Sequence, residues 1–377
     1  MARSPDPNVA FVGWNPFQFL HFAPIAARFP RSTLIVEKRP PGWDRSVLRT
    51  RFPESRIMEL GPGEMEKLDG KFDILVCQTL FHGIGKMRKS RIAMLQYGYA
   101  KEAHNFGAWR SFADVCMTFG PYASQKVTPF CHAAPIGNPR FECWDESSFR
   151  TRAADRLAGR LDPAKKTLLY APTWGALSSI KEFAKAIRAL SAEYNVILKV
   201  HHNTQRFDAS TLDDLRGEFG CIHGADEDIV ELLAVSDALL SDFSGAIFDA
   251  IYGRVPVLLL GTAAPESTSD GFSLEQARRD ELGEQVARPA DLPAAVARVL
   301  VRPLSPAGGA AGLREELFRE AAGAAARAEE VIRRLAAGEF RPNQSQLYIR
   351  KEMAELQEFR ERSRRFGRWF RMLRRRS

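Results

Sequence analysis

A turn of small and polar residues, Ser241 to Gly245, lies between a short apolar segment and a helical one and has the composition of a phosphate site. Small residues at the start of a helix let an anion approach the free backbone N–H groups, and the hydroxyls of Ser241 and Ser244 add donors. The alternative is that Ser244 only caps the helix and Asp242 only stabilises the turn. This segment alone leaves both interpretations open.

A second candidate is the loop after the apolar segment 72–77, which contains His82, Gly83 and Lys86. Neutral imidazole near pH 7 suits the removal of a proton from a hydroxyl group, so His82 is a candidate general base. The alternative is a loop histidine that only hydrogen-bonds the backbone. For this loop taken alone, the alternative is the commoner outcome.

Two further polar groups follow apolar segments in the second half of the chain. Thr173 lies after segment 167–171, where its hydroxyl could contact a phosphate or cap the next helix. Lys199 and His201 lie two residues apart, so in an extended strand they share one face and can reach the same site. Adjacent His201 and His202 would point to opposite faces, and no cysteine or carboxylate cluster accompanies them. We therefore expect no metal site.

Short apolar segments alternate with helical stretches along most of the chain, which is typical of a doubly wound α/β fold with a mainly parallel sheet. We predict an N-terminal Rossmann-like domain over residues 1–150 and a C-terminal one over 151–340, facing each other across a cleft. Ligands of such sheets bind beyond the carboxyl ends of the strands, where the candidate residues lie. The expected strands are 9–12, 33–36, 72–77, 92–95, 115–118, 167–171, 195–200, 238–240 and 255–260.

The composition is that of an ordinary globular protein, with 377 residues of which 45% are hydrophobic. We find neither a run of about 18 apolar residues nor a signal-peptide core, so we expect a cytoplasmic protein. The five cysteines follow no metal-binding spacing and are expected to be reduced. The net charge of +8 is confined to residues 341–377, which hold twelve Lys or Arg and four Asp or Glu. The neutral remainder counts against a nucleic-acid groove.

The basic segment 341–377 has a helical pattern that mixes aromatic and basic residues. Phe366, Trp369 and Phe370 fall on one face of a helix, and Arg365 and Arg374 are among the arginines on the rest of it. Such a helix binds the surface of an anionic membrane, to which each basic residue adds about 1 kcal/mol. The alternatives are a solvated tail or a helix packed on the N-terminal domain. We predict a protein peripheral to the inner face of the cell membrane.

Five motifs, in this order, resemble those of the CDP-glycerol glycerophosphotransferase family, which includes teichoic-acid and capsule polymerases. The resemblance covers residues from about 70 to 260 and implies a two-domain fold of the glycosyltransferase-B (GT-B) type. The motifs are Phe81-His82-Gly83-Ile84-Gly85-Lys86, Gly137-Asn138-Pro139-Arg140, Tyr170-Ala171-Pro172-Thr173-Trp174, Lys199-Val200-His201-His202 and Ser241-Asp242-Phe243-Ser244-Gly245-Ala246-Ile247-Phe248-Asp249.

The resemblance implies an enzyme of the EC 2.7.8 type. It would transfer a polyol phosphate, glycerol phosphate first among them, from a CDP-activated donor to a hydroxyl of a lipid-linked or cell-surface glycan, releasing CMP. No cofactor is implied. By the same resemblance His82 is the base, Gly83 and Lys86 complete the acceptor-side loop, and Gly137 and Arg140 form the turn between the domains.

On the donor side, the resemblance gives His201 the task of balancing charge on the diphosphate as CMP leaves, with Lys199 as a second candidate. Three departures concern the donor: Gly245 replaces a serine, His202 replaces a proline, and Gly175 stands where the family often has arginine. CDP-glycerol, CDP-ribitol and nucleotide sugars remain open as donors. The residues expected to bind phosphate are Thr173, Lys199, Ser241, Asp242, Ser244 and Gly245.

Two other functions fit the same sequence features. One is another enzyme of the same fold, either a glycosyltransferase that uses a nucleotide-sugar donor in the synthesis of capsule or cell-surface polysaccharide, or a sugar-nucleotide epimerase. The other is a nucleotide-binding protein without catalytic activity. The loop of His82 and Lys86 belongs to the phosphotransferase pattern and favours the first interpretation over both.

Overall fold

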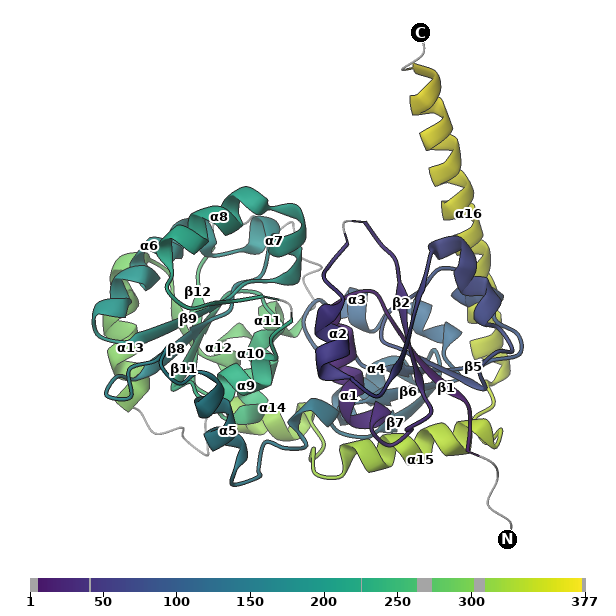
Figure 1. Cartoon of the computed structure of the whole chain (residues 1–377), viewed down its shortest axis with the longest axis horizontal. Coiled ribbons are helices and arrows are strands. Elements are labelled where there is room, and N and C mark those ends of the chain that lie inside the picture. The colour runs from purple at the N-terminus through teal and green to yellow at the C-terminus, as the bar shows by residue number, and fades with distance from the viewer. Residues whose placement is uncertain (1–5, 41, 225, 263–272, 302–308, 375–377) are drawn as a thin grey trace.

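The computed structural model describes residues 6–40, 42–224, 226–262, 273–301 and 309–374. The chain forms two α/β domains side by side, each built on a parallel sheet (Figure 1). The seven-stranded sheet of the N-terminal domain has the order β3-β2-β1-β4-β5-β6-β7. Its strands are β1 (Val9–Gly13), β2 (Thr33–Glu37), β3 (Arg56–Leu60), β4 (Ile74–Cys77), β5 (Arg91–Leu95), β6 (Val115–Thr118) and β7 (His132–Pro135).

Helix α1 directs side chains of the N-terminal domain toward the other domain. Asn15 begins it, because the Asn15 side chain accepts the backbone N–H of Gln18 and Pro16 takes the first helical position. This start places Phe17 and His21 at the edge of the cleft. The helices and 3₁₀ helices (η) of this domain are α1 (Pro16–Ala26), α2 (Ser46–Arg51), η1 (Pro62–Leu68), η2 (Ile84–Lys86), α3 (Glu102–Asn105), η3 (Ala108–Phe112), α4 (Pro121–Val127) and η4 (Pro139–Phe141).

The C-terminal domain has a six-stranded parallel sheet of order β10-β9-β8-β11-β12-β13. Its strands are β8 (Thr167–Tyr170), β9 (Asn195–Lys199), β10 (Ile222–His223), β11 (Ala238–Ser241), β12 (Val257–Leu260) and β13 (Glu284–Val286). Its helices are α5 (Phe149–Arg156), η5 (Gly175–Leu177), α6 (Ile180–Ala189), η6 (Leu190–Ala192), α7 (His202–Phe207), α8 (Ala209–Glu218), α9 (Ile229–Ala234), α10 (Ala246–Gly253), α11 (Leu274–Ala277), α12 (Arg279–Leu282), η8 (Pro289–Asp291) and α13 (Leu292–Val301).

Successive residues of the C-terminal strands face two different cores, as the period of two in a strand requires. Leu168 packs with α6, α8 and α13, whereas Leu169 belongs to a core that includes α9, α10 and the N-terminal domain. In this shared core the rings of Tyr99 and Phe248, one from each domain, lie 5.6 Å apart. The two domains therefore meet through apolar contacts next to the cleft.

The chain crosses back to the N-terminal domain after α13. Helix α14 (Gly309–Leu317) packs on α10 and α12 of the C-terminal domain as well as on α4, and α15 (Ala324–Ala336) packs on β4, β5 and β6. Helix α16 (Gln344–Arg374) begins on the same domain, where Arg350 donates to the carbonyls of Ser111 and Ala113. Helix α15 therefore packs on the N-terminal domain, although the sequence analysis assigned residues up to 340 to the C-terminal domain. Figure 1 shows α16 projecting beyond the domain.

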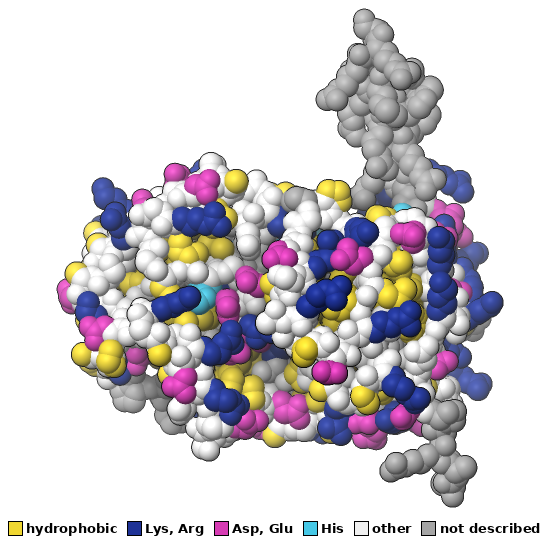
Figure 2. Space-filling model, in the orientation of Figure 1, with side chains coloured by type: hydrophobic (Ala, Val, Ile, Leu, Met, Phe, Trp, Pro, Cys, Tyr) yellow, Lys and Arg dark blue, Asp and Glu magenta, His cyan; other side chains and the backbone are white. Residues whose placement is uncertain are grey.

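The predicted fold of two Rossmann-like parallel-sheet domains facing a cleft is confirmed. All nine expected strands are present, and the four strands that were not expected are β3, β7, β10 and β13. Each of these four lies at an edge of its sheet. On the face seen in Figure 2, basic and acidic side chains are interspersed over both domains, as expected for a neutral body. Among the described residues, no helix combines the length and apolar character of a membrane span.

Candidate active site

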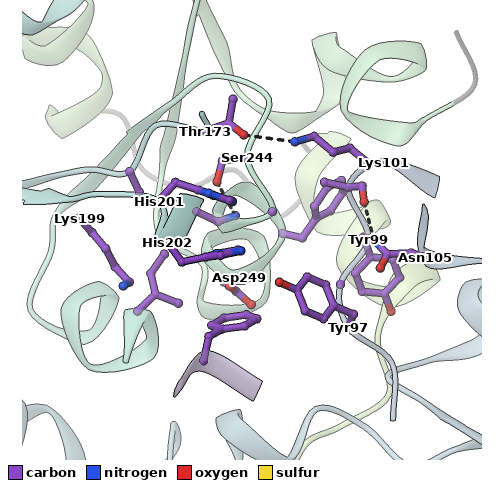
Figure 3. Close-up of a pocket in the computed structure, with 18 of the residues that line it drawn as sticks. Tyr97, Tyr99, Lys101, Asn105, Thr173, Lys199, His201, His202, Ser244 and Asp249 are labelled. Carbon is purple, nitrogen blue, oxygen red and sulfur yellow. Dashed lines mark hydrogen bonds between the residues drawn. The ribbon is translucent and has the colours of Figure 1, made fainter. Parts of the chain in front are cut away.

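A pocket lies between the two domains, beyond the carboxyl ends of strands from both sheets. The N-terminal domain contributes α1 and the loop after β5, and the C-terminal domain contributes the loops after β8, β9 and β11 (Figure 3). This is the position predicted from the strand ends. The residues labelled in Figure 3 are Tyr97, Tyr99, Lys101, Asn105, Thr173, Lys199, His201, His202, Ser244 and Asp249.

The side chains of Ser241 and Asp242 do not line the pocket. They hydrogen-bond the loop that does. Both are fully buried, and the Ser241 hydroxyl donates to the carbonyl of Ala171 at 2.7 Å. The Asp242 carboxylate accepts the backbone N–H groups of Thr173 and Ser179, each at 2.8 Å. These bonds tie the loop after β8 to the turn after β11. The direct phosphate contact predicted for the two side chains does not match their placement.

Thr173, Ser244 and Gly245 do line the pocket. The Ser244 hydroxyl accepts the N–H of Ala246 at 3.3 Å, but the residue that caps α10 is Gly245. Gly245 has a φ of −60°, and a Cβ built on it meets nothing within 4 Å. The backbone conformation at this position therefore does not require glycine. A glycine in place of the serine that the family has here leaves space at the start of α10.

His201 faces the pocket as a neutral donor. Its Nδ1 accepts the backbone N–H of Asn203 at 3.1 Å and so caps α7. A backbone N–H can only donate, so the imidazole proton lies on Nε2. Burial, with smaller contributions from the nearby His202, Lys101 and Lys199, lowers the pKa of His201 to about 2. His201 can thus donate to a phosphate oxygen through Nε2–H, without carrying a charge before the ligand binds.

Aromatic neighbours fix the plane of the His201 ring. It lies roughly parallel to the rings of Trp174 and His202, with ring centres 6.3 Å and 4.2 Å away. Burial lowers the pKa of His202 to about 4, with Arg206, Lys199 and Lys101 adding to the effect. Neither histidine is therefore protonated at neutral pH in the pocket.

Lys199 lines the pocket beside His201, as predicted for two residues on one face. Its ammonium donates to the carbonyl of Gly224 at 2.6 Å. Burial lowers the pKa of Lys199 to about 8, although Asp228 opposes this. Lys199 therefore remains mainly cationic at pH 7 and contributes positive charge close to the pocket.

Arg140 connects the two domains at the base of the pocket. Its guanidinium donates to Nε2 of His21 at 2.8 Å and to the carboxylate of Asp228. Because a guanidinium cannot accept a hydrogen bond, Nε2 of His21 must accept, and burial keeps the pKa of His21 well below its ordinary value. His21 is thus engaged and neutral. Arg140 and Gly137 occupy the interdomain turn that the sequence predicted, and Gly137 has a φ of +86°.

Asp249 is a carboxylate in the pocket that sequence reasoning did not single out. It lies on α10, and in Figure 3 its carboxyl group is drawn between His202 and the hydroxyl of Tyr97. Burial raises the pKa of Asp249 to about 6, with Arg140 opposing the increase. Asp249 therefore changes its protonation state close to neutral pH. Its place at the end of the Ser241–Asp249 motif was the available signal.

The loop of His82, Gly83 and Lys86 follows β4 in the N-terminal domain. None of the three lines the pocket. Lys86 pairs with Glu66 of η1 at 2.7 Å, and a Cβ on Gly83 would meet the same Glu66 side chain at 2.5 Å. The backbone N–H of His82 donates to Glu37. The pocket lined by His201, Thr173 and Ser244 therefore does not include these three residues.

The N-terminal wall of the pocket comes instead from the loop after β5, which includes Tyr97, Tyr99 and Lys101. Burial raises the pKa of Tyr97 to about 12, so its hydroxyl stays protonated. The strand before this loop was expected at 92–95. Because ligands of such sheets bind beyond the carboxyl ends of the strands, the loop residues could have been predicted as part of the site. Among the described residues, no group of three or more His, Cys, Asp or Glu side chains is placed to hold a metal.

Comparisons with known proteins agree with the motifs. A family model described as CDP-Glycerol:Poly(glycerophosphate) glycerophosphotransferase matches residues 127–261. A teichoic acid glycerol-phosphate transferase of Staphylococcus aureus is 26% identical over 181 residues, 44% of this chain and 43% of that protein. A teichoic acid poly(glycerol phosphate) polymerase of Bacillus subtilis is 34% identical over 105 residues, 25% of this chain and 14% of that protein. The matches thus span less than half of either curated relative.

Solved structures share the fold over most of the chain. The wall teichoic acid polymerase TagF has a TM-score of 0.62 at 15% identity, covering 89% of this chain and 90% of that chain. A UDP-GlcNAc 2-epimerase from Neisseria meningitidis, solved bound to UDP-GlcNAc, has a TM-score of 0.57 at 12% identity, covering 86% and 98%. These similarities confirm the predicted GT-B-like fold. The fold alone does not choose between a transferase and an epimerase.

Proposed function

We propose that this chain transfers a polyol phosphate from a CDP-activated donor, because its residues 127–261 match the family model of the CDP-glycerol glycerophosphotransferases. Glycerol phosphate is the first candidate for the group transferred. The acceptor is a hydroxyl of a lipid-linked or cell-surface glycan, and CMP is the second product. The proposal treats the donor nucleotide as substrate and requires no resident cofactor.

The observation that carries the proposal is the set of anion-binding groups in the pocket. Lys199 supplies positive charge, His201 supplies an Nε2–H donor, and Thr173 and Ser244 supply hydroxyls beside the start of α10. Hydrogen-bond donors aimed at a phosphate in a water-poor site stabilise the charge that develops during transfer. A diphosphate in this pocket would meet donors on several sides.

The proposed reaction is a substitution at phosphorus. The acceptor hydroxyl oxygen forms a bond to the phosphorus that bears the polyol, and the bond from that phosphorus to the oxygen bridging the two phosphates breaks. The bridging oxygen leaves as part of CMP. Alignment of the reacting atoms and neutralisation of oxygen charge supply most of the catalysis in such reactions. The pocket needs no covalent intermediate for this chemistry.

The hydroxyl proton requires an acceptor, and we assign this role to Asp249. His82 was the expected base, but it is not among the residues that line the pocket. In the pocket His21 already accepts from Arg140, and His201 accepts a backbone N–H. Asp249, with its pKa raised by burial to about 6, is ionised at pH 7 and basic enough to accept the proton.

Incubation with CDP-glycerol, CDP-ribitol and common UDP- and GDP-sugars tests the reaction class. We expect CMP from a CDP-alcohol, faster when a glycan acceptor is added, because phosphoryl transfer breaks the bridging bond of the diphosphate. Separation of the nucleotide products by chromatography is the measurement. Release of UDP or GDP instead would reject phosphotransfer in favour of glycosyl transfer, and release of no nucleotide would support a binding protein.

We further propose that the end of α16 holds the enzyme at the inner face of the membrane. The support is the continuous course of α16 to Arg374 and the excess of basic residues after position 340. The predicted arrangement of Arg365, Phe366, Trp369, Phe370 and Arg374 on the helix concerns side chains outside the described residues. Attachment would bring the pocket close to a lipid-linked acceptor.

Deletion of residues 361–377 tests membrane attachment. The deletion removes most of the basic residues of segment 341–377. Each basic residue contributes about 1 kcal/mol to binding at an anionic membrane surface. The deletion keeps Arg350 and Met353, which hold α16 on the N-terminal domain. We expect the truncated chain to lose co-sedimentation with phosphatidylglycerol vesicles yet to hydrolyse a soluble CDP-alcohol at the original rate. Undiminished sedimentation would reject the membrane role, and phosphatidylcholine vesicles serve as the control.

A further inference from the structure

Lys101 has an uncommon backbone conformation at the edge of the pocket. Its φ is +58°, and among the described residues other than glycine only Arg254 shares a positive φ. A side chain with a Cβ adopts this left-handed region at a cost, which surrounding contacts must offset. Residues held in this way concentrate at functional sites. The conformation of Lys101, in the wall of the pocket, therefore points to a functional role for this residue.

Contacts from the other domain hold the backbone at Lys101. Its N–H donates to the Glu275 carboxylate at 2.8 Å, and the N–H of Glu102 donates to the Ser273 hydroxyl at 3.0 Å. Both acceptors belong to the start of α11 in the C-terminal domain. The loop after β5 is thereby fixed to the opposite side of the cleft, with the Lys101 side chain in the pocket (Figure 3).

The ammonium group of Lys101 has a hydroxyl partner, because its Nζ donates to Oγ1 of Thr173 at 3.3 Å. Among the described residues it forms no salt bridge, and Glu275 and Asp242 act on it only through their charge. Burial lowers the pKa of Lys101, although Glu275 and Asp242 oppose the decrease. A cation withdrawn from water is costly unless an anion compensates it. An anionic ligand in the pocket would supply that compensation.

We propose that Lys101 binds a phosphoryl oxygen of the donor from the N-terminal side, opposite Ser244 and His201, so that the phosphates are held by both domains at once. This role rests on the proposed function, because it assigns the anion to the CDP-activated donor. It replaces Lys86 as the cation of the acceptor-side domain at the site. Glu275 and Ser273 of the C-terminal domain hold the loop that carries Lys101. Lys101 can therefore reach the phosphate only when the two domains are in contact.

Binding of inorganic pyrophosphate to the full chain, measured by calorimetry, tests the site without assuming a donor. Lys101→Met removes the charge and keeps the length of the side chain, and Lys101→Arg keeps the charge. We expect Lys101→Met to weaken pyrophosphate binding by about 10- to 100-fold, the usual effect of losing a bond to a charged group. Lys101→Arg should remain within a few fold of the original protein.

Lys166→Met is the matched control. Lys166 directly precedes β8, at the amino ends of the strands and so away from the pocket, and it pairs with Asp237. This variant should bind pyrophosphate normally. The proposal is overturned if the original protein binds no pyrophosphate, if Lys101→Met binds it equally well, or if Lys101→Arg fails as completely as Lys101→Met. Pyrophosphate binding that depends on Lys101, with no CMP released from any CDP-alcohol, would keep the anion site and reject the phosphotransferase.

Discussion

Replacing His201 by asparagine should lower the turnover rate of CMP release by about 10²- to 10³-fold while the chain stays folded. The Nε2–H of His201 is the group that we expect to bind the developing charge on the diphosphate. Asparagine is a good helix cap, so its oxygen can still accept the N–H of Asn203 that begins α7. The substitution therefore separates the catalytic donor from the structural cap. Steady-state kinetics with CDP-glycerol would measure the loss.

Two further variants make this result interpretable. His201→Ala removes both the donor and the cap, so it should lose the same activity and also about 1 kcal/mol of stability. His104→Asn changes an exposed histidine of the N-terminal domain and should leave turnover unchanged. Wild-type turnover in His201→Asn would show that the Nε2–H does not act in the transition state.

Replacing Asp249 by asparagine should have opposite effects on activity and stability. Loss of the proton acceptor should lower turnover by about 10²- to 10⁴-fold, the usual contribution of a general base. At pH 7.5 and about 25 °C the same variant should be more stable than the original protein, by up to ~3 kcal/mol for a pKa raised from 3.8 to about 6. The reason is that folding withdraws the Asp249 carboxylate from water.

The gain in stability should depend on pH with a defined sign. Because the folded-state pKa of Asp249 exceeds the unfolded one, the folded protein holds the proton between about pH 4 and 6, and the stability of the original protein falls as the pH rises through that range. The difference between Asp249→Asn and the original should therefore be small at pH 4 and full above pH 7. Urea unfolding at several pH values would measure it.

A purely structural Asp249 would predict a different combination. If Asp249 served mainly to hold Arg140, its replacement would destabilise the protein at pH 7.5, and activity would fall only as the folded fraction fell. Asp213→Asn, at an exposed carboxylate paired with Arg216, should change neither activity nor stability at any of these pH values. Turnover in the original protein should also rise with pH with a midpoint of about 6, as Asp249 ionises.

The central strands could be predicted because their residues are apolar on both faces. Val9 to Val12, for example, are at most 2% exposed, and their neighbours Leu34 to Val36 are fully buried. Edge strands lack this signal. In β3, Arg56 and Glu59 are exposed, and β13 has an exposed Gln285. One side of an edge strand has no neighbouring strand, so polar residues there cost little and the strand resembles a loop in sequence.

The sequence by itself placed Thr173, His201, Ser244 and Gly245 at one site, because each follows a strand of one parallel sheet and such strands end at a common edge. Only the tertiary structure decided which loop of the N-terminal domain joins them. The loop of His82 and the loop of Lys101 follow neighbouring strands, so strand order does not separate them.

Contacts between distant parts of the chain make that choice. Glu275 holds Lys101 across 174 residues of sequence, and Asp242 reaches Thr173 across 69. The same long-range packing sets the burial that lowers the pKa of His201 and raises that of Asp249. Residue type and spacing therefore determined which chemistry the chain can carry, and packing determined which side chains meet the ligand, because burial and distance arise only when the two domains come together.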